Sequence, residues 1–320
     1  MGIAFLFAGQ GAQQVGMGKD LYEAYPAVRE LYDRAQAAVP FDLKRISFEG
    51  PEDELKRTDV SQPAIVVCAL AALRALEAEC AALGQPLPTA TCAAGLSLGE
   101  YSALCFAGVL SLEDTLRLVI ARGRLMQACC DARPSGMTSV LGLGAADLAP
   151  AVEAGLPLGP VGVANDNAPQ QVVLSGAREA LDAAAAKAKE LGAKRTIPLA
   201  VAGAYHSQLM APAGDGLARE LATAQVQPAR VPVISNVTAA PHGADPEQLR
   251  RLLVEQVSAT VRWRESMAHV FGLGVERCVE LGPGGVLKGL VRQNDRGRSC
   301  VSVLTVEDAR AAARELAGQA

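Results

Sequence analysis

Three long stretches of this chain carry no charged side chain, and they constrain its fold more than any other feature. They cover residues 2–18, 80–99 and 196–214. Their length would suit a membrane-spanning helix, but each contains several Gly, Pro, Gln, Ser or Thr residues, which such a helix does not carry in this number. We therefore predict three buried strand-and-loop segments in a protein that does not span a membrane.

Composition excludes several classes of protein. Half of the 320 residues are hydrophobic and 20% are charged, which excludes a disordered chain. The net charge of −4 and the few aromatic residues (6 Phe, 5 Tyr, 1 Trp) argue against a nucleic-acid-binding protein. The length suits one large domain, or a domain with an insertion, around a substantial core.

The cysteines and the first residues indicate the compartment. The eight cysteines form no Cys-x-x-Cys pair and have no histidine nearby, so we expect neither a metal site nor a disulfide framework. The first residues lack the basic region of a secretory signal, and Leu6 stands where a myristoylation signal needs Ser or Thr. We expect a cytoplasmic protein.

Short apolar runs alternate with helical patterns along most of the chain. Strands are predicted over 3–7, 89–94, 231–234 and 275–281, and helices over 25–39, 62–83, 98–108, 112–130 and 246–257. This alternation predicts an α/β fold.

The middle of the chain has a different order of elements. Strands are predicted over 137–143, 161–164, 171–175 and 193–197, and helices over 145–154 and 177–191. The resulting order, βαββαβ, is that of a ferredoxin-like unit. We therefore predict a main body over 1–132 and 199–320 with an inserted subdomain over 133–198.

A serine lies where a predicted strand turns into a predicted helix. Residues 95–99 read GLSLG, with Ser97 at the centre. A nucleophile elbow needs small residues around its serine because the turn is sharp, and the helix amides stabilise negative charge there. The alternative is a chance match to a short motif.

A nucleophilic serine needs a base, and the chain has three histidines. His242 lies in a turn-rich segment, and His269 lies in a helical segment of mixed polarity. His206 lies in the third uncharged stretch. A buried histidine is more often a hydrogen-bonded core residue than a catalyst, but the need of Ser97 for a partner makes His206 the candidate base.

Arg122 is a cation within an apolar helical segment. A buried guanidinium pairs either with a carboxylate of the protein or with an anionic ligand. From the residues alone, structural pairing is the better interpretation. Arg124, on another side of the same helix, is expected to face solvent.

In their order, these motifs resemble the malonyl-CoA:acyl-carrier-protein transacylase family over nearly the whole chain. The matching segments are 7–13 (FAGQGAQ), 94–104 (AGLSLGEYSAL), Arg122-Gly123 with Met126-Gln127, 203–207 (GAYHS), Gln256 with Trp263, and 280–284 (ELGPG). Three residues depart from the family pattern: Ala8 replaces a proline, Leu96 a common histidine, and Tyr205 a common phenylalanine. The resemblance implies an α/β-hydrolase-like body with a ferredoxin-like subdomain.

The resemblance also implies roles for six residues. Ser97 would be the nucleophile and His206 its base, and Arg122 would hold the free carboxylate of a malonyl group. An oxygen of Gln256 would accept a hydrogen bond from the base. The oxyanion hole would consist of the backbone N–H groups of Gln10 and Leu98.

The implied activity is malonyl transfer from malonyl-CoA, through a malonyl-Ser97 ester, to the phosphopantetheine thiol of an acyl carrier protein of fatty-acid synthesis. A discrete acyltransferase that loads a polyketide synthase is the alternative. An acyl hydrolase is less favoured, because a hydrolase of ordinary acyl chains gains nothing from a buried cation such as Arg122. A non-catalytic carrier-binding protein is less favoured, because Ser97, His206 and Arg122 are all intact. We expect a monomer that binds no cofactor. A basic cluster of Lys288, Arg292, Arg296 and Arg298 either docks the carrier or is a solvated helix end.

Overall fold

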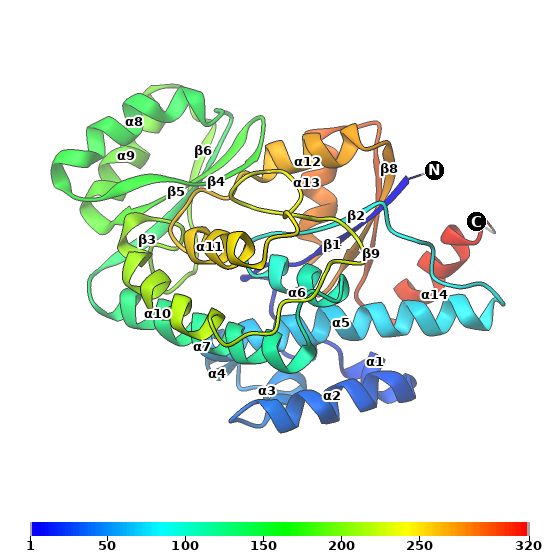
Figure 1. The fold of residues 1–320 in the computed structure, drawn as a ribbon. Coiled ribbons are helices and arrows are strands. Elements are labelled where there is room, and N and C mark those ends of the chain that lie inside the picture. The colour runs from blue at the N-terminus through cyan, green and yellow to red at the C-terminus, as the bar shows by residue number, and fades with distance from the viewer. Residues whose placement is uncertain (1, 319–320) are drawn as a thin grey trace. The chain divides into compact units, whose positions relative to one another are not determined.

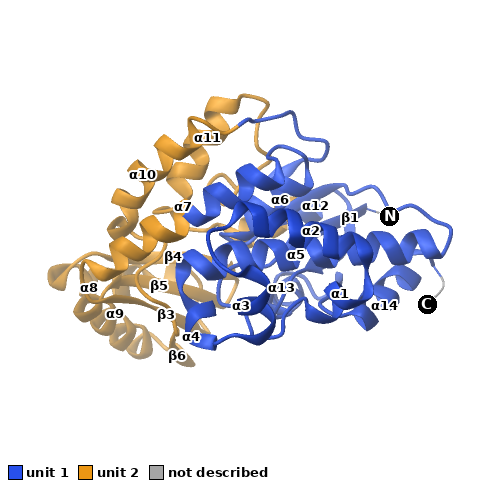
Figure 2. Ribbon diagram, turned by 90° about the horizontal axis from the view of Figure 1, so that it is seen from below, with its two compact units in different colours: residues 1–120, 225–234, 270–320 blue, residues 121–224, 235–269 orange. Residues whose placement is uncertain are grey.

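The computed structural model describes residues 2–318, and the chain divides into two units, which Figure 2 colours separately. Unit 1 comprises Met1–Ile120, Gln225–Ile234 and Val270–Ala320, and unit 2 comprises Ala121–Ala224 and Ser235–His269. Unit 2 thus contains the segment 133–198, for which the sequence predicts an insert, together with flanking residues. The predicted boundaries at 133 and 198 stay a prediction.

A parallel five-stranded sheet organises unit 1, in the order β7-β2-β1-β8-β9. Its strands are β1 (Gly2–Phe7), β2 (Cys92–Gly95), β7 (Val233–Ile234), β8 (Val275–Leu281) and β9 (Ser299–Val303). Residues Ile3–Phe7 of β1 and all of β2 and β7 are buried on both faces, as is usual in parallel sheets. Phe7 pairs with Gly95 on one side and with Leu281 on the other. The loops that follow β1, β2 and β8 therefore leave the sheet at the same edge.

Helices cover this sheet (Figure 1). The longest, α5 (Thr58–Ala82), is buried along most of its length and packs against α2 (Pro26–Ala38) and α14 (Val306–Leu316). The other helices that lie wholly in this unit are α1 (Lys19–Ala24), α3 (Leu43–Glu49), α4 (Glu52–Lys56), α6 (Gly99–Phe106) and α13 (Val286–Asn294). Among residues 2–318, no helix has the length and apolar character needed to cross a membrane.

Unit 2 contains a separate antiparallel sheet in the order β4-β5-β3-β6. Its strands are β3 (Ser135–Leu141), β4 (Val161–Ala168), β5 (Gln171–Ala177) and β6 (Arg195–Pro198). Helices α8 (Ala149–Gly155) and α9 (Arg178–Glu190) pack on it around a core that includes Val140, Val172, Leu174 and Leu181. Two short 3₁₀ turns, Ala146–Leu148 and Leu156–Leu158, flank α8. The order of strands and helices in this segment is the one predicted from the sequence.

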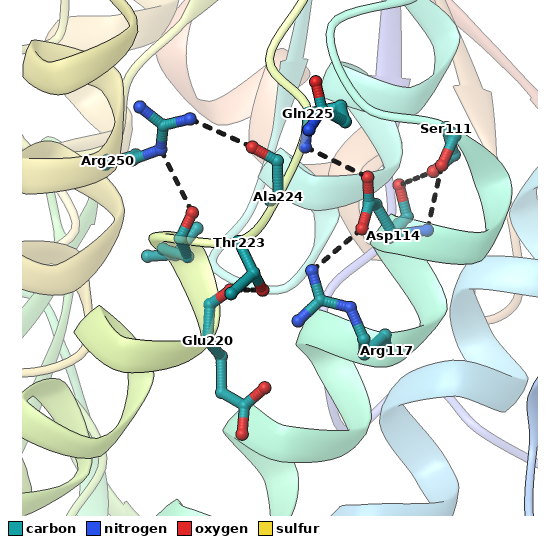
Figure 3. A network of polar contacts seen from close by, with 10 residues as sticks. Ser111, Asp114, Arg117, Glu220, Thr223, Ala224, Gln225 and Arg250 are labelled. Carbon is teal, nitrogen blue, oxygen red and sulfur yellow. Dashed lines mark hydrogen bonds and ion pairs between the residues drawn. The ribbon is translucent and has the colours of Figure 1, made fainter.

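Hydrogen bonds from side chains stabilise the ends of several helices, as Figure 3 shows. In unit 2, Arg250 of α11 (Pro246–Gln256) donates to the carbonyl oxygens of Leu221 and Ala224, at and beyond the end of α10 (Ala211–Leu221). In unit 1, Asp114 near the start of α7 (Leu112–Asp131) accepts hydrogen bonds from Arg117 and from the backbone N–H of Gln225. Helix α12 spans Trp263–Gly272.

Candidate active site

Ser97 occupies a strained turn between β2 and α6. Its φ of 53° lies in the left-handed region, which non-glycine residues adopt rarely and mostly at functional sites. The N–H of Glu100 donates to the carbonyl of Ser97 at 3.1 Å, so the serine immediately precedes the first turn of α6. Its side chain thus lies where helix amides can stabilise a developing negative charge.

The glycines around this serine are required by close packing. A Cβ on Gly95 would lie 1.9 Å from the carbonyl carbon of Gly99, and a Cβ on Gly99 would lie 2.1 Å from the carbonyl oxygen of Phe7. A Cβ on Gly9 would lie 2.5 Å from the carbonyl oxygen of Leu96. These approaches are the physical reason for small residues on both sides of the elbow, and they press the loop after β1 against it.

The loop after β1 carries Gln10. The N–H of Leu96 donates to the carbonyl of Phe7 at 3.2 Å, which ties the elbow to the start of this loop. The side-chain oxygen of Gln10 accepts a hydrogen bond from Nε2 of Gln62, on α5, at 3.4 Å. Gln62 is fully buried, and sequence reasoning missed it. Its one signal was a glutamine within an otherwise apolar helical pattern.

The Gly-rich turn after β8 supports the same loop. The N–H of Ala8 donates to the carbonyl of Leu281 at 3.2 Å. A Cβ on Gly284 would lie 2.9 Å from Cβ of Ala12. Ala8 and Ala12, on either side of Gln10, therefore both contact the segment formed by the end of β8 and this turn.

Glu280, at the end of β8, fixes the far side of that turn and was also missed as a positioning residue. Its carboxylate is fully buried and accepts hydrogen bonds from the N–H groups of Leu287 (2.8 Å) and Lys288 (3.1 Å). It accepts a third from Oγ of Ser302 at 2.7 Å. A carboxylate at the start of α13 is stabilised by the amides and dipole of that helix.

The candidate base lies in unit 2. His206 is 5% exposed and also has a positive φ, of 54°. Its Nδ1 lies 2.8 Å from the carbonyl oxygen of Gln256, the last residue of α11. A carbonyl oxygen can only accept, so Nδ1 carries the hydrogen in this bond, and Nε2 of the neutral ring keeps its lone pair.

The surroundings keep this imidazole neutral. Burial lowers the pKa of His206 to about 4, and the positive charge of Arg122 acts in the same direction. Hydrogen bonds to the carbonyls of Gln256 and Ala259 raise the pKa, but by less. At neutral pH the ring is therefore free to accept a proton.

Arg122 lies beside this histidine in the same unit. It is a residue of α7, it is 1% exposed, and its Nη2 donates to the side-chain oxygen of Gln256 at 3.2 Å. A hydrogen bond to a neutral amide orients the guanidinium without neutralising its charge. Gln256 thus contacts both residues, through its side chain on Arg122 and through its main chain on His206.

The loop that carries His206 is anchored on both sides. Oγ of Ser207 donates to the carbonyl of Ala204 at 2.6 Å, and the N–H of Ala204 donates to Oγ of Ser135 at 3.2 Å. A Cβ on Gly203 would lie 2.5 Å from Sγ of Cys130. These contacts hold the strained conformation at the histidine.

The residues with predicted roles in the site form two groups, one in each unit. Gln10, Ser97 and Leu98 lie at one edge of the parallel sheet, and Arg122, His206 and Gln256 form a buried cluster. His242 and His269 are half-buried, and Arg124 is exposed as expected. In the basic cluster, Lys288, Arg292 and Arg296 are exposed, whereas Arg298 bonds Asp295 at 3.1 Å.

Comparison with known proteins finds one family and many relatives. The model of the acyl transferase domain matches residues 4–313. The malonyl CoA-acyl carrier protein transacylase of Bacillus subtilis is 39% identical over 302 residues, which cover 94% of this chain and 93% of that protein. A crystal structure of an acyl-carrier-protein S-malonyltransferase from Bartonella henselae is 40% identical, has a TM-score of 0.92, and is matched over 99% of this chain and 100% of that chain. A malonyl-transacylase in complex with its type II polyketide-synthase acyl carrier protein is 34% identical, with a TM-score of 0.93, over 98% of this chain and 100% of that chain.

Proposed function

The chain belongs to the acyl transferase family, and from that premise we propose that it moves a malonyl group from malonyl-CoA to the thiol of an acyl carrier protein. The observation that carries this proposal is the buried cluster in unit 2, where Gln256 holds both a cation and a neutral imidazole. A cation suits the free carboxylate of a malonyl group. A neutral imidazole suits the activation of a hydroxyl nucleophile.

In the first half-reaction, Nε2 of His206 takes the proton of the Ser97 hydroxyl as the oxygen attacks the thioester carbonyl. The tetrahedral oxyanion accepts hydrogen bonds from the backbone N–H groups of Gln10 and Leu98. When the intermediate collapses, the carbon–sulfur bond breaks and His206 returns the proton to the CoA thiolate. The product is a malonyl ester of Ser97.

The second half-reaction runs the same steps in reverse with another thiol. The phosphopantetheine thiol of the carrier gives its proton to His206 and attacks the ester, and Ser97 leaves with that proton. Water competes with the thiol at this stage, so the site must shelter the ester. The scarcity of charged residues in the segments around Gln10, Ser97 and His206 supports such a shelter.

Arg122 would select the acyl group. A guanidinium can pair with a carboxylate through two parallel hydrogen bonds, which fixes both charge and geometry. An acetyl group has no carboxylate to offer. We therefore assign to Arg122 the preference for a dicarboxylic acyl group.

The finer description of the fold belongs to the same proposal. The strand order of the antiparallel sheet supports the ferredoxin-like description of the subdomain, and the elbow at the end of β2 supports the hydrolase-like description of the body. A monomeric state, the absence of a bound cofactor and a cytoplasmic location stay predictions from the sequence. We further propose that the exposed Lys288, Arg292 and Arg296 attract an acidic carrier.

The carrier belongs to fatty-acid synthesis in our first proposal and to polyketide synthesis in a second. The second is supported by the structural similarity to a malonyl-transacylase in complex with a polyketide-synthase carrier. Both carriers present the same thiol arm. Parallel assays with the two carrier types, comparing kcat/KM, would assign the chain to one of them.

One experiment tests the reaction itself. The protein is incubated with radiolabelled malonyl-CoA with and without an acyl carrier protein, and acyl-enzyme and products are followed in time. We expect label on Ser97 that moves to the carrier faster than it appears as free malonate, and no label on Ser97→Ala. Release mainly as free malonate would instead identify an acyl hydrolase.

A further inference from the structure

Gln256 connects the proposed carboxylate-binding residue to the proposed base. Its side-chain oxygen accepts from Nη2 of Arg122 at 3.2 Å, and its main-chain oxygen lies 2.8 Å from Nδ1 of His206. Arg122 is 1% exposed and His206 is 5% exposed. A guanidinium and an imidazole are thus held on opposite ends of one residue, away from solvent.

Charges at such a site act on each other strongly, because little water screens them. A guanidinium stays protonated in proteins, so Arg122 is a fixed positive charge. When His206 takes a proton from a nucleophile, it becomes a second positive charge in the same cluster. The fixed charge therefore opposes the proton transfer that the reaction requires.

Neutral groups also surround His206. The end of α11 and the segment after it contribute the carbonyl dipoles of Gln256 and Ala259, which favour the protonated ring. The neighbours of His206 on its own loop, Tyr205 and Ser207, have neutral side chains. Arg122, on α7, contributes the positive charge that disfavours the protonated ring of His206.

We propose that a carboxylate bound to Arg122 strengthens His206 as a base, so that a malonyl substrate activates the base that acts on its own thioester. The carboxylate would neutralise the guanidinium and thereby remove the repulsion on the developing imidazolium. This inference rests on the proposed function for the identity of the substrate. It adds that selectivity arises in the chemical step as well as in binding, because an acetyl group meets the weaker base.

The coupling can be measured in the resting enzyme by NMR titration of the imidazole resonances. The chain has three histidines, and His206→Gln identifies the resonance of interest by its loss. We expect the pKa of His206 to rise by about one pH unit in Arg122→Gln and to stay low in Arg122→Lys, which keeps the charge. Arg124→Gln, which removes a charge from an exposed position on the same helix, should leave it unchanged.

A second variant mimics the bound substrate. Gln256→Glu has nearly the same shape, keeps the main-chain oxygen that faces His206, and places a carboxylate on Arg122. The pKa of His206 should rise in this variant without any malonyl compound. Circular dichroism shows whether both variants are folded. If they are folded and the pKa of His206 is unchanged in both Arg122→Gln and Gln256→Glu, the proposal is overturned.

The kinetic consequence separates this inference from the proposed function. Acetyl transfer by Arg122→Gln at neutral pH should be about threefold faster in kcat than in the wild type, as expected for a base strengthened by about one unit. If the wild type forms no malonyl-enzyme, the proposed function fails, whereas the NMR titration still reports on the coupling. If transfer occurs and the titration does not change, the coupling alone fails.

Discussion

Nη2 of Arg122 donates a hydrogen bond to the side-chain oxygen of Gln256 at 3.2 Å, although 134 positions separate these residues in the chain. The bond fixes the direction of a buried cation with a neutral partner. An amide oxygen orients a guanidinium without neutralising its charge, which an ion pair with a carboxylate would do. The contact supports the substrate-binding role that we propose for Arg122.

Removing this cation should change which acyl group is transferred. In Arg122→Ala, kcat/KM for malonyl-CoA should fall by about two to three orders of magnitude, as expected when one partner of a buried charge pair is lost. Acetyl transfer should be retained or should increase. Both rates are measured by transfer of label to the carrier, with Arg124→Ala as the matched control. Equal losses for the two acyl groups would show that Arg122 is structural.

His206 should make the protein less stable in acid. Its pKa is about 4 in the folded state, below the ordinary value near 6.5 of the unfolded chain, so the unfolded state binds the proton first. The loss of stability begins as the pH falls below about 6.5 and levels off below pH 4, where it amounts to about 3 kcal/mol.

The measurement is urea unfolding at a series of pH values for the wild type and His206→Gln. Carboxylates contribute equally to both proteins, so the difference between the two curves isolates the histidine. We expect the wild type to lose about 3 kcal/mol more than His206→Gln as the pH falls from 7 to 4. Parallel curves would contradict a buried neutral imidazole.

The elbow should not tolerate a methyl group at Gly95. Its Cβ would lie 1.9 Å from the carbonyl carbon of Gly99, so Gly95→Ala must displace the backbone that carries Ser97. We expect acyl-enzyme formation to be lost and the free energy of unfolding to fall by about 4 kcal/mol or more. The control is Gly289→Ala on α13, where a Cβ meets nothing within 4 Å. That change should stabilise the protein by about 0.5–1 kcal/mol.

Glu280→Gln should test the support of the Gln10 loop. The carboxylate accepts three hydrogen bonds, and an amide in its place would direct an NH₂ group at one or more of those donors. The expected cost is about 1–3 kcal/mol in the free energy of unfolding. If the turn positions Gln10, kcat should fall more than KM rises. Ser302→Ala, which removes only one of the three donors, should have the smaller effect on both measurements.

Local patterns were sufficient to predict much of the fold and the chemical candidates. The GLSLG elbow, the βαββαβ order and the place of His206 in an uncharged stretch all follow from neighbouring residues, whose periodicity and size are readable from one segment. The predicted strand over 89–94 begins later, at Cys92, because the end of a loop and the start of a strand differ little in local pattern. Arg122 acquired a preferred role only through the family resemblance.

The amino-acid sequence by itself determined which residues could serve as nucleophile, base and cation, since each is set by its type and its immediate surroundings. The tertiary structure decided what surrounds them. Gln62 meets Gln10, Glu280 holds the turn beneath the Gln10 loop, and Gln256 contacts Arg122 through its side chain and His206 through its main chain. These contacts join residues from distant segments, and no local pattern encodes them. They form only when packing of the apolar strands and helices brings those segments together, and that packing also desolvates His206 and lowers its pKa.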